Sequence, residues 1–134
     1  MPAFKKIAVL GASGLIGQPV VKQLANAGFD LTLVSRDSSK LKSAFPNLSG
    51  TKFVQADVSD PSTLKEAFNG TLKPRDLSDV NVGVDVVLSL LGAPALTTQK
   101  TFIDAAVEAR VKRFIPSEFG CDTQAPYLYI PLCF

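Results

Sequence analysis

Short apolar runs along this chain alternate with longer segments in which apolar residues recur every three or four positions. The runs have the length of strands that are buried on both faces, and they fall at residues 6–10, 31–34, 52–55, 84–90 and 113–116. The segments between them have the period of helices with one buried face. This alternation predicts an α/β protein with a doubly wound parallel sheet that helices cover on both faces.

The helical segments also show where helices begin and end. Gly28 is expected to end the first helix, and Asp60 and Pro61 are expected to begin the third. The second and fourth helices are predicted at residues 38–45 and 98–109. The positions predicted to face the core are Leu15, Ile16, Val20, Val21 and Leu24 in the first helix and Phe102, Ile103, Ala106 and Val107 in the last. Five strands and four helices suffice for a Rossmann-type, three-layer α/β/α fold with strand order 3-2-1-4-5.

Three glycines at intervals of three follow the first predicted strand, in the stretch IAVLGASGLIG at residues 7–17. Gly11, Gly14 and Gly17 let the backbone turn sharply and approach a pyrophosphate, whose charge lies at the amino-terminal end of the next helix. The pattern is informative because it follows a strand directly and opens a helix with an apolar face. It predicts a dinucleotide site, and the alternative is a glycine turn with a structural role alone.

Cofactor choice in such a fold is set where the second strand ends, because the adenosine ribose lies there. The chain has SRDSSK at this point, in which Arg36 offers a planar guanidinium that matches a phosphate and Lys40 follows four residues later. Asp37 has two interpretations. It hydrogen-bonds a ribose 2′-hydroxyl and favours NAD, or it caps the next helix. We favour the cap, and with it NADP(H) over NAD.

Polar residues also follow the third and fourth predicted strands, at the edge where ligands of such sheets bind. Asp57 is predicted either to meet the adenine or to help cap the helix that follows it. Ser89 is predicted either to line the nucleotide crevice beside the glycine turn or to have a structural role alone.

Composition narrows the class of protein further. A length of 134 residues allows one domain at most, and a hydrophobic share of 46% supplies a core. The net charge of +2, with no block of Lys and Arg, gives no reason to expect nucleic acid or a membrane as partner. The sequence has no histidine and only two cysteines, Cys121 and Cys133, so no metal site is expected.

The chain is expected to be cytoplasmic, since it has neither a signal peptide nor an apolar run of transmembrane length. Residues 1–122 are expected to form the NAD(P)-binding domain. Residues 123–134 form an atypical apolar tail, which either covers the sheet edge or results from truncation. The polar stretch at residues 71–82 is expected to be a connector.

The segment VKRFIPSEFG at residues 111–120, taken with GASGLIG and SRDSSK, resembles the isoflavone reductase-like and NmrA-like proteins. These form an atypical branch of the short-chain dehydrogenases and reductases, and the resemblance runs from about Phe4 to Asp122. It implies an NADPH-binding Rossmann domain from reductases that pass a hydride to an aromatic substrate. The implied contacts are Ser13, Leu15 and Ile16 with the pyrophosphate, Arg36 and Lys40 with the 2′-phosphate, and Ser117 and Phe119 with the nicotinamide ribose. For Phe119 the alternative is core packing.

Several departures from the family pattern bear on catalysis. The family's reductases carry a catalytic lysine after PSEFG, whereas no Lys or Arg follows Arg113 in this sequence. The Tyr-x-x-x-Lys pair of the short-chain dehydrogenases is also missing, so no catalytic residue is assigned. Arg110 stands where relatives usually have glycine, and a left-handed backbone there would cost roughly 1–2 kcal/mol.

The sequence therefore supports two functions. The first is the NADP(H)-binding domain of a reductase of this family, shortened so that the catalytic lysine and the substrate region are missing. The second is a regulator that senses NADP(H) without catalysis and acts through a protein partner.

Overall fold

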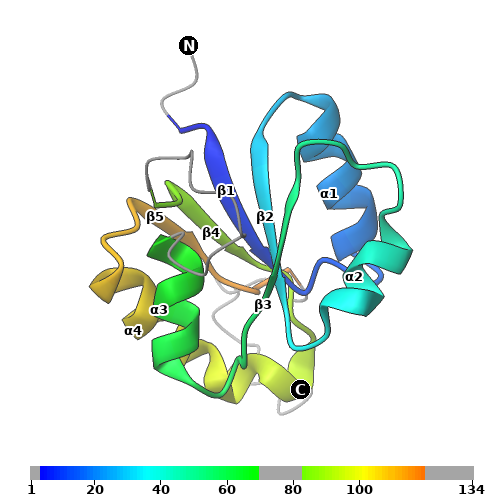
Figure 1. The fold of residues 1–134 in the computed structure, drawn as a ribbon. Coiled ribbons are helices and arrows are strands. Elements are labelled where there is room, and N and C mark those ends of the chain that lie inside the picture. The colour runs from blue at the N-terminus through cyan, green and yellow to red at the C-terminus, as the bar shows by residue number, and fades with distance from the viewer. Residues whose placement is uncertain (1–3, 70–82, 120–134) are drawn as a thin grey trace, which may run out of the picture.

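The computed structural model describes residues 4–69 and 83–119 of the chain. Its strands form one parallel sheet in the order β3-β2-β1-β4-β5, as the sequence predicts (Figure 1). The strand bounds are β1 Lys6–Leu10, β2 Asp30–Ser35, β3 Lys52–Gln55, β4 Val86–Ser89 and β5 Arg113–Ile115. All five carboxyl ends therefore meet at one edge of the sheet.

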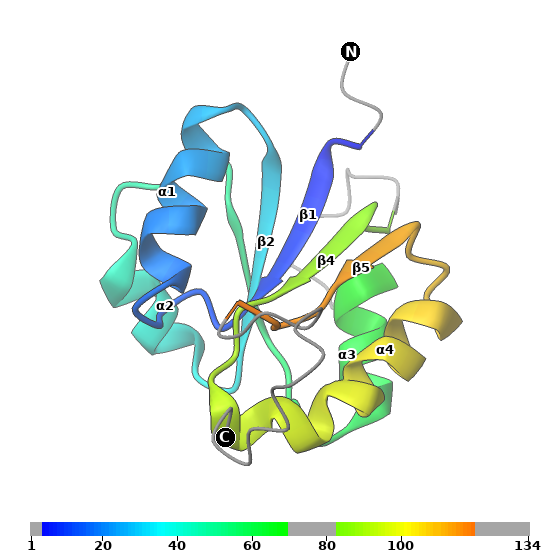
Figure 2. The same ribbon diagram turned by 180° about the vertical axis from the view of Figure 1, so that it is seen from behind.

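Helices cover both faces of this sheet, as Figures 1 and 2 show from opposite sides. Their bounds are α1 Gly17–Asn26, α2 Ser38–Ala44, α3 Pro61–Asn69 and α4 Gln99–Glu108, with a short 3-10 helix η1 at Ala93–Thr98. Helices α1 and α2 lie on one face, and α3 and α4 lie on the other. The three-layer α/β/α arrangement that the alternation predicts is confirmed.

Two cores fill the spaces between these layers, because successive strand residues point to opposite faces. Val9 and Leu33 pack with Val21 and Leu41 of the helices on the α1 side. The core on the α3 side comprises Ala8, Leu10, Val34, Ala56, Leu64, Ala67, Phe68, Val87, Phe102, Ala105 and Ala106. Both faces of β1 are buried, which explains why its sequence reads as an unbroken apolar run.

Two of the predicted core faces are wrong in part. Leu15 and Ile16 are 97% and 53% exposed, because α1 begins only at Gly17 and both residues lie in the preceding turn. Ile103 and Val107 of α4 are also exposed, since the buried stripe of that helix runs through Phe102, Ala105 and Ala106. The two exposed residues are four apart, so they form the neighbouring stripe of the same helix.

Backbone conformations confirm two of the expected helix ends. Gly28 follows α1 with a φ of +80°, and Asp60 caps α3 by accepting a hydrogen bond from the backbone amide of Ser62 at 2.9 Å. Arg110 follows α4 with a φ of 56°, so the left-handed conformation expected there is also present. Its side chain stands at a position that favours glycine.

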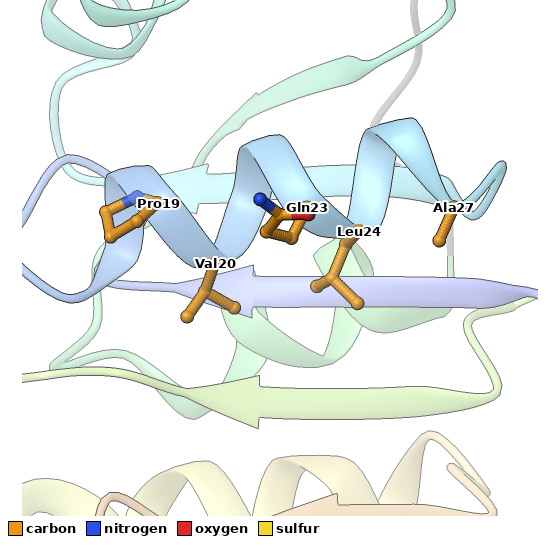
Figure 3. Close-up of a pocket in the computed structure, with 5 residues that line it drawn as sticks. All are labelled: Pro19, Val20, Gln23, Leu24 and Ala27. Carbon is orange, nitrogen blue, oxygen red and sulfur yellow. The ribbon is translucent and has the colours of Figure 1, made fainter.

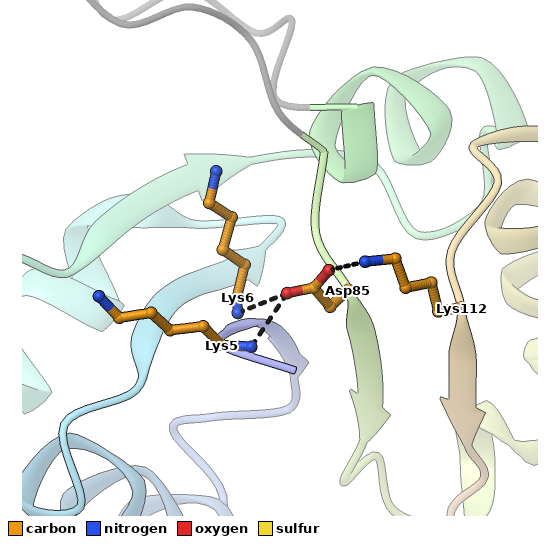
Figure 4. Close-up of polar contacts among 4 residues, drawn as sticks. All are labelled: Lys5, Lys6, Asp85 and Lys112. Atoms are coloured by element: carbon orange, nitrogen blue, oxygen red, sulfur yellow. Dashed lines mark hydrogen bonds and ion pairs between the residues drawn. The ribbon is translucent and has the colours of Figure 1, made fainter. Parts of the chain in front are cut away.

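Asp85 joins three strands at the amino-terminal edge of the sheet, opposite the carboxyl ends (Figure 4). Its carboxylate accepts hydrogen bonds from the backbone amides of Lys5 and Lys6, both at 3.0 Å, and from Lys112 Nζ at 2.7 Å. These hydrogen bonds lower the pKa of Asp85 to about 2, the one from Lys112 having the largest effect. The cluster fixes the starts of β1, β4 and β5 relative to one another.

The expected connector at residues 71–82, the tail at residues 123–134 and both cysteines lie outside the described residues. Within residues 4–69 and 83–119, no helix is long and apolar enough to cross a membrane. In the same ranges, no three His, Cys, Asp or Glu side chains come together as a metal-binding group.

Candidate functional site

The glycine turn after β1 is packed so tightly that two of its positions exclude any side chain. A Cβ at Gly11 would lie 2.7 Å from the carbonyl oxygen of Leu90, just beyond β4, and the φ of Gly11 is +78°. A Cβ at Gly17 would overlap the carbonyl oxygens of Gly11 and Ala12. The turn therefore folds back on itself and brings the start of α1 directly against the end of β1.

This turn presents backbone amides that have no partner within the described residues. The amide of Gly14 donates to the Gly11 carbonyl at 3.1 Å and closes the turn, whereas the amides of Ser13, Leu15 and Ile16 donate to no other described group. Ile16 is the N-cap of α1 and provides no side-chain cap, and the first turn of the helix has no acidic residue. Unpartnered amides at a helix N-terminus suit an anion such as a diphosphate.

Asp37, just after β2, caps helix α2. One oxygen of its carboxylate accepts hydrogen bonds from the backbone amides of Ser39 at 2.9 Å and Lys40 at 3.3 Å. The prediction of a helix cap is thereby confirmed. Arg36 and Lys40 on either side of it are exposed, and neither forms an ion pair with another described residue. Two exposed cations therefore lie near the end of β2, together with a carboxylate that is hydrogen-bonded to the start of α2.

Asp57 lies beyond β3 and forms a local turn ahead of α3. Its carboxylate accepts a hydrogen bond from the backbone amide of Ser59 at 2.8 Å, and the cap of α3 is Asp60. Asp57 also contributes at the start of α3 through its backbone, because its carbonyl oxygen accepts a hydrogen bond from the Thr63 hydroxyl at 3.1 Å. Asp57 is exposed at the carboxyl edge, and its contact with an adenine stays a prediction.

Ser89 ends β4 with its side chain fully buried. Its exposed fraction is 0%, and its Oγ has no hydrogen-bond partner among the described residues. Strand alternation places this hydroxyl on the same face as Val87, which packs in the core on the α3 side. The Ser89 side chain is thus not exposed at the carboxyl edge of the sheet. A direct contact between Ser89 and a nucleotide stays a prediction.

Ser117 follows β5 and is anchored to two other elements. Its Oγ donates to the carbonyl oxygen of Leu91 at 2.6 Å, and its backbone amide donates to Oε1 of Gln99 at 2.8 Å. Phe119, two residues later, is 55% exposed. The sequence interpretation did not single out Gln99, and the only available signal was its place at the start of the helix that precedes β5.

A shallow groove of about 510 Å³ lies along α1 and contains none of the predicted site residues (Figure 3). Its lining residues are Pro19, Val20, Gln23, Leu24 and Ala27. Val20 and Leu24 point from the helix towards the strands. The groove is almost entirely apolar, so it offers little chemistry for recognising a phosphate or a ribose.

The predicted site residues lie at or beyond the carboxyl ends of parallel strands, so the fold places them along one edge of the sheet. The described residues of this edge are Gly11, Ser13, Gly14, Leu15, Ile16, Gly17, Arg36, Lys40, Asp57, Ser89, Ser117 and Phe119. The strand order reverses between β1 and β4, which is the switch point where ligands bind in open α/β sheets. The edge therefore combines amide donors, cations and an exposed aromatic ring.

Comparisons with known proteins agree with this arrangement. The model of the NmrA-like family matches residues 3–131. An oxidoreductase of Aspergillus flavus is 39% identical over 120 residues, which are 89% of this chain and 35% of that protein. The crystal structure of an isoflavone reductase has a TM-score of 0.70 at 27% identity, over 90% of this chain and 38% of that one. A leucoanthocyanidin reductase from Vitis vinifera, solved with NADPH, shares the fold with a TM-score of 0.65 at 22% identity, over 87% of this chain and 35% of that one.

The fold and the glycine turn define a Rossmann-type α/β protein. The family match covers nearly the whole chain, and the chain therefore belongs to the NmrA-like family, with isoflavone reductase among its structural relatives. It spans between about a third and two fifths of the length of these relatives.

Proposed function

We propose that this chain binds NADPH, with the diphosphate on the backbone amides of Ser13, Leu15 and Ile16. The observation that carries the proposal is the group of amides at Ser13, Leu15 and Ile16, which point to no other described group at the start of α1. A bound diphosphate supplies oxygens to these amides and charge complementarity to the helix dipole. The exposure of Leu15, at 97%, leaves the turn open to a ligand.

The preference for NADPH over NADH is proposed to come from Arg36 and Lys40. Both cations are exposed where β2 ends, at the place where the adenosine ribose lies in this fold. Arg36 supplies a planar fork of donors for a 2′-phosphate, and charge-assisted hydrogen bonds of this kind contribute about 1.5–3 kcal/mol each. The Oδ1 oxygen of Asp37 accepts from the amides of Ser39 and Lys40, and the carboxylate is therefore proposed to serve helix α2 in preference to a ribose 2′-hydroxyl.

For a longer protein that contains this chain and has the length of its relatives, the proposed function is hydride transfer to an aromatic substrate. The names of the relatives, an oxidoreductase and an isoflavone reductase, support a reductase. No residue described here is proposed as the proton donor. A regulator of this family would bind NADPH without oxidising it, and loss of NADPH absorbance on adding a phenylpropanoid or quinone acceptor distinguishes the reductase from the regulator.

Calorimetric titration of the chain with NADPH and NADH tests the proposed binding. Arg36→Ala is expected to weaken NADPH binding by about tenfold or more, equivalent to about 1.4 kcal/mol, and to leave NADH binding unchanged. Lys42→Ala is the matched control, because Lys42 is an exposed cation in the last turn of α2. Equal affinity of the wild-type chain for NADPH and NADH would contradict the proposed specificity, and no binding of either would contradict the proposed function.

A further inference from the structure

The segment after β5 leads to Phe119 at the carboxyl edge, whereas the Asp85 cluster fixes β5 at its opposite, amino-terminal end. Strand β5 has three residues and lies at the edge of the sheet, where β4 is its only partner among residues 4–69 and 83–119. Its two outer residues, Arg113 and Ile115, are exposed. The pairing with β4 ends at Ile115, so contacts beyond the strand are needed to fix the place of the residues that follow.

Hydrogen bonds of Ser117 supply the missing attachment. Its backbone amide donates to Oε1 of Gln99, the first residue of α4. Its hydroxyl donates to the carbonyl oxygen of Leu91, beyond β4. Pro116 has no amide to donate, so Ser117 is the first residue after β5 that can anchor the backbone through an N–H group. The anchor therefore acts directly ahead of Phe119 and links it to α4.

The hydroxyl of Ser117 therefore forms an intramolecular hydrogen bond. Its single proton points to the Leu91 carbonyl at 2.6 Å, which leaves the oxygen only as an acceptor towards a ligand. The side-chain amide oxygen of Gln99, the first residue of α4, accepts from the Ser117 amide and so ties the segment to that helix. Both hydrogen bonds of Ser117 thus attach the segment after β5 to neighbouring parts of the protein.

We propose that Gln99 is a positioning residue which, through the backbone of Ser117, holds Phe119 against the nicotinamide half of bound NADPH. This inference rests on the proposed function. Gln99 does not touch the cofactor in this account, and its effect is carried by the amide that it accepts from. Loss of that acceptor leaves the Ser117 amide unpaired and frees the segment, and small displacements of positioning groups weaken binding and catalysis strongly.

Two ligands separate positioning at the nicotinamide end from a general loss of structure. NADPH has a nicotinamide, whereas adenosine 2′,5′-bisphosphate has the adenine and 2′-phosphate without it. Gln99→Leu keeps the approximate size of the side chain and removes the acceptor. It is expected to raise the Kd for NADPH by about fivefold to tenfold, the effect of one lost hydrogen bond, and to leave the Kd for the bisphosphate within about twofold.

The conservative variant and a distant control sharpen the test. Gln99→Glu retains an oxygen acceptor for the Ser117 amide and is expected to keep NADPH binding near that of the wild type. Gln23→Leu makes the same exchange on the exposed side of α1 and is expected to change neither affinity. Chemical unfolding of all three variants is the control that tests whether each is folded at the titration temperature.

Three results would overturn the inference. The first is an unchanged NADPH affinity in Gln99→Leu while the wild type binds NADPH, and this result leaves the proposed function intact. The second is an equal loss of affinity for both ligands in a folded variant, which indicates a general effect on the fold. The third is a wild-type chain that binds neither ligand, and this result overturns the proposed function together with the inference.

Discussion

The carboxylate of Asp37 accepts a hydrogen bond from the backbone amide of Ser39 at 2.9 Å. An acidic residue after the second strand of a Rossmann fold can have two roles, and this contact gives Asp37 the role of a helix cap. A carboxylate that is directed to a ribose 2′-hydroxyl favours NADH, whereas one that caps the next helix leaves the neighbouring cations to determine specificity. The cap therefore connects the local structure of α2 with the proposed preference for NADPH.

Two substitutions of Asp37 separate its charge from its role as a cap. Asparagine is an equally good N-cap, so Asp37→Asn is expected to keep the stability of the chain and to tighten NADPH binding, since a negative charge near the 2′-phosphate is removed. Asp37→Ala is expected to lower the free energy of unfolding by about 1 kcal/mol. Calorimetry and urea unfolding measure the two effects. A weaker affinity for NADPH in Asp37→Asn would contradict this role of Asp37.

Gly17 is the glycine whose replacement is expected to be most damaging. An added Cβ meets the backbone carbonyls of Gly11 and Ala12, which cannot move without opening the turn. Gly17→Ala is expected to cost about 2–3 kcal/mol of stability and to abolish NADPH binding. Gly14→Ala is the milder comparison, because its Cβ would lie 3.3 Å from the Gly11 carbonyl oxygen. Wild-type binding by Gly17→Ala would show that the turn does not hold the ligand.

Asp85 is expected to make the stability of the chain depend on pH in the acid range. Its pKa is about 2 in the folded protein and 3.8 ordinarily, so its contribution is complete above pH about 4 and is lost as the pH falls towards 2. Asp85→Asn is expected to lower the free energy of unfolding at neutral pH by about 1–2 kcal/mol, and the difference from the wild type is expected to disappear near pH 2.

Denaturant unfolding at a series of pH values measures this dependence on Asp85. Asp30→Asn is the control, because Asp30 forms an exposed ion pair with Lys5 at 3.7 Å and such pairs contribute below about 1 kcal/mol. A difference between the wild type and Asp85→Asn that stays constant from neutral pH to pH 2 would show that ionisation of Asp85 is not the cause.

Arg110 offers a substitution that is expected to stabilise the chain. Its φ of 56° is strained for a side chain, and glycine removes a cost of roughly 1–2 kcal/mol that is partly offset by the greater freedom of glycine in the unfolded state. Arg110→Gly is therefore expected to raise the free energy of unfolding by up to about 1 kcal/mol, whereas Arg110→Ala is expected to leave it unchanged. Thermal unfolding of both variants measures the difference, and destabilisation by glycine would contradict the assignment of strain.

Strand order and the major helices could be predicted from the sequence because they depend on local periodicity and on general rules of connection. The unbroken apolar run of β1 and the glycine at position 28 determine local structure wherever they occur. Leu15 and Ile16 were mistaken for core residues because their spacing continues the stripe of α1, and only the position at which Gly17 begins the helix separates them from it.

The remaining features depend on contacts between residues far apart in the sequence. The bond from Ser117 to Gln99 joins residues 18 positions apart, and nothing in the local sequence of α4 marks that glutamine. Likewise, Asp85 meets Lys5 across 80 positions. Such pairings arise from the geometry of the sheet, so the helix cap at Asp37 was predictable and the support of the segment after β5 was not.

The central claim is that the amides of Ser13, Leu15 and Ile16 hold the diphosphate of NADPH. Amide chemical shifts recorded during an NADPH titration of the isotope-labelled chain test it most directly. The account predicts that the largest saturable shifts occur at Ser13, Leu15 and Ile16, with further changes at Arg36 and Lys40. Shifts confined to the α1 groove around Val20 and Leu24, or no shifts at saturating NADPH, would contradict it.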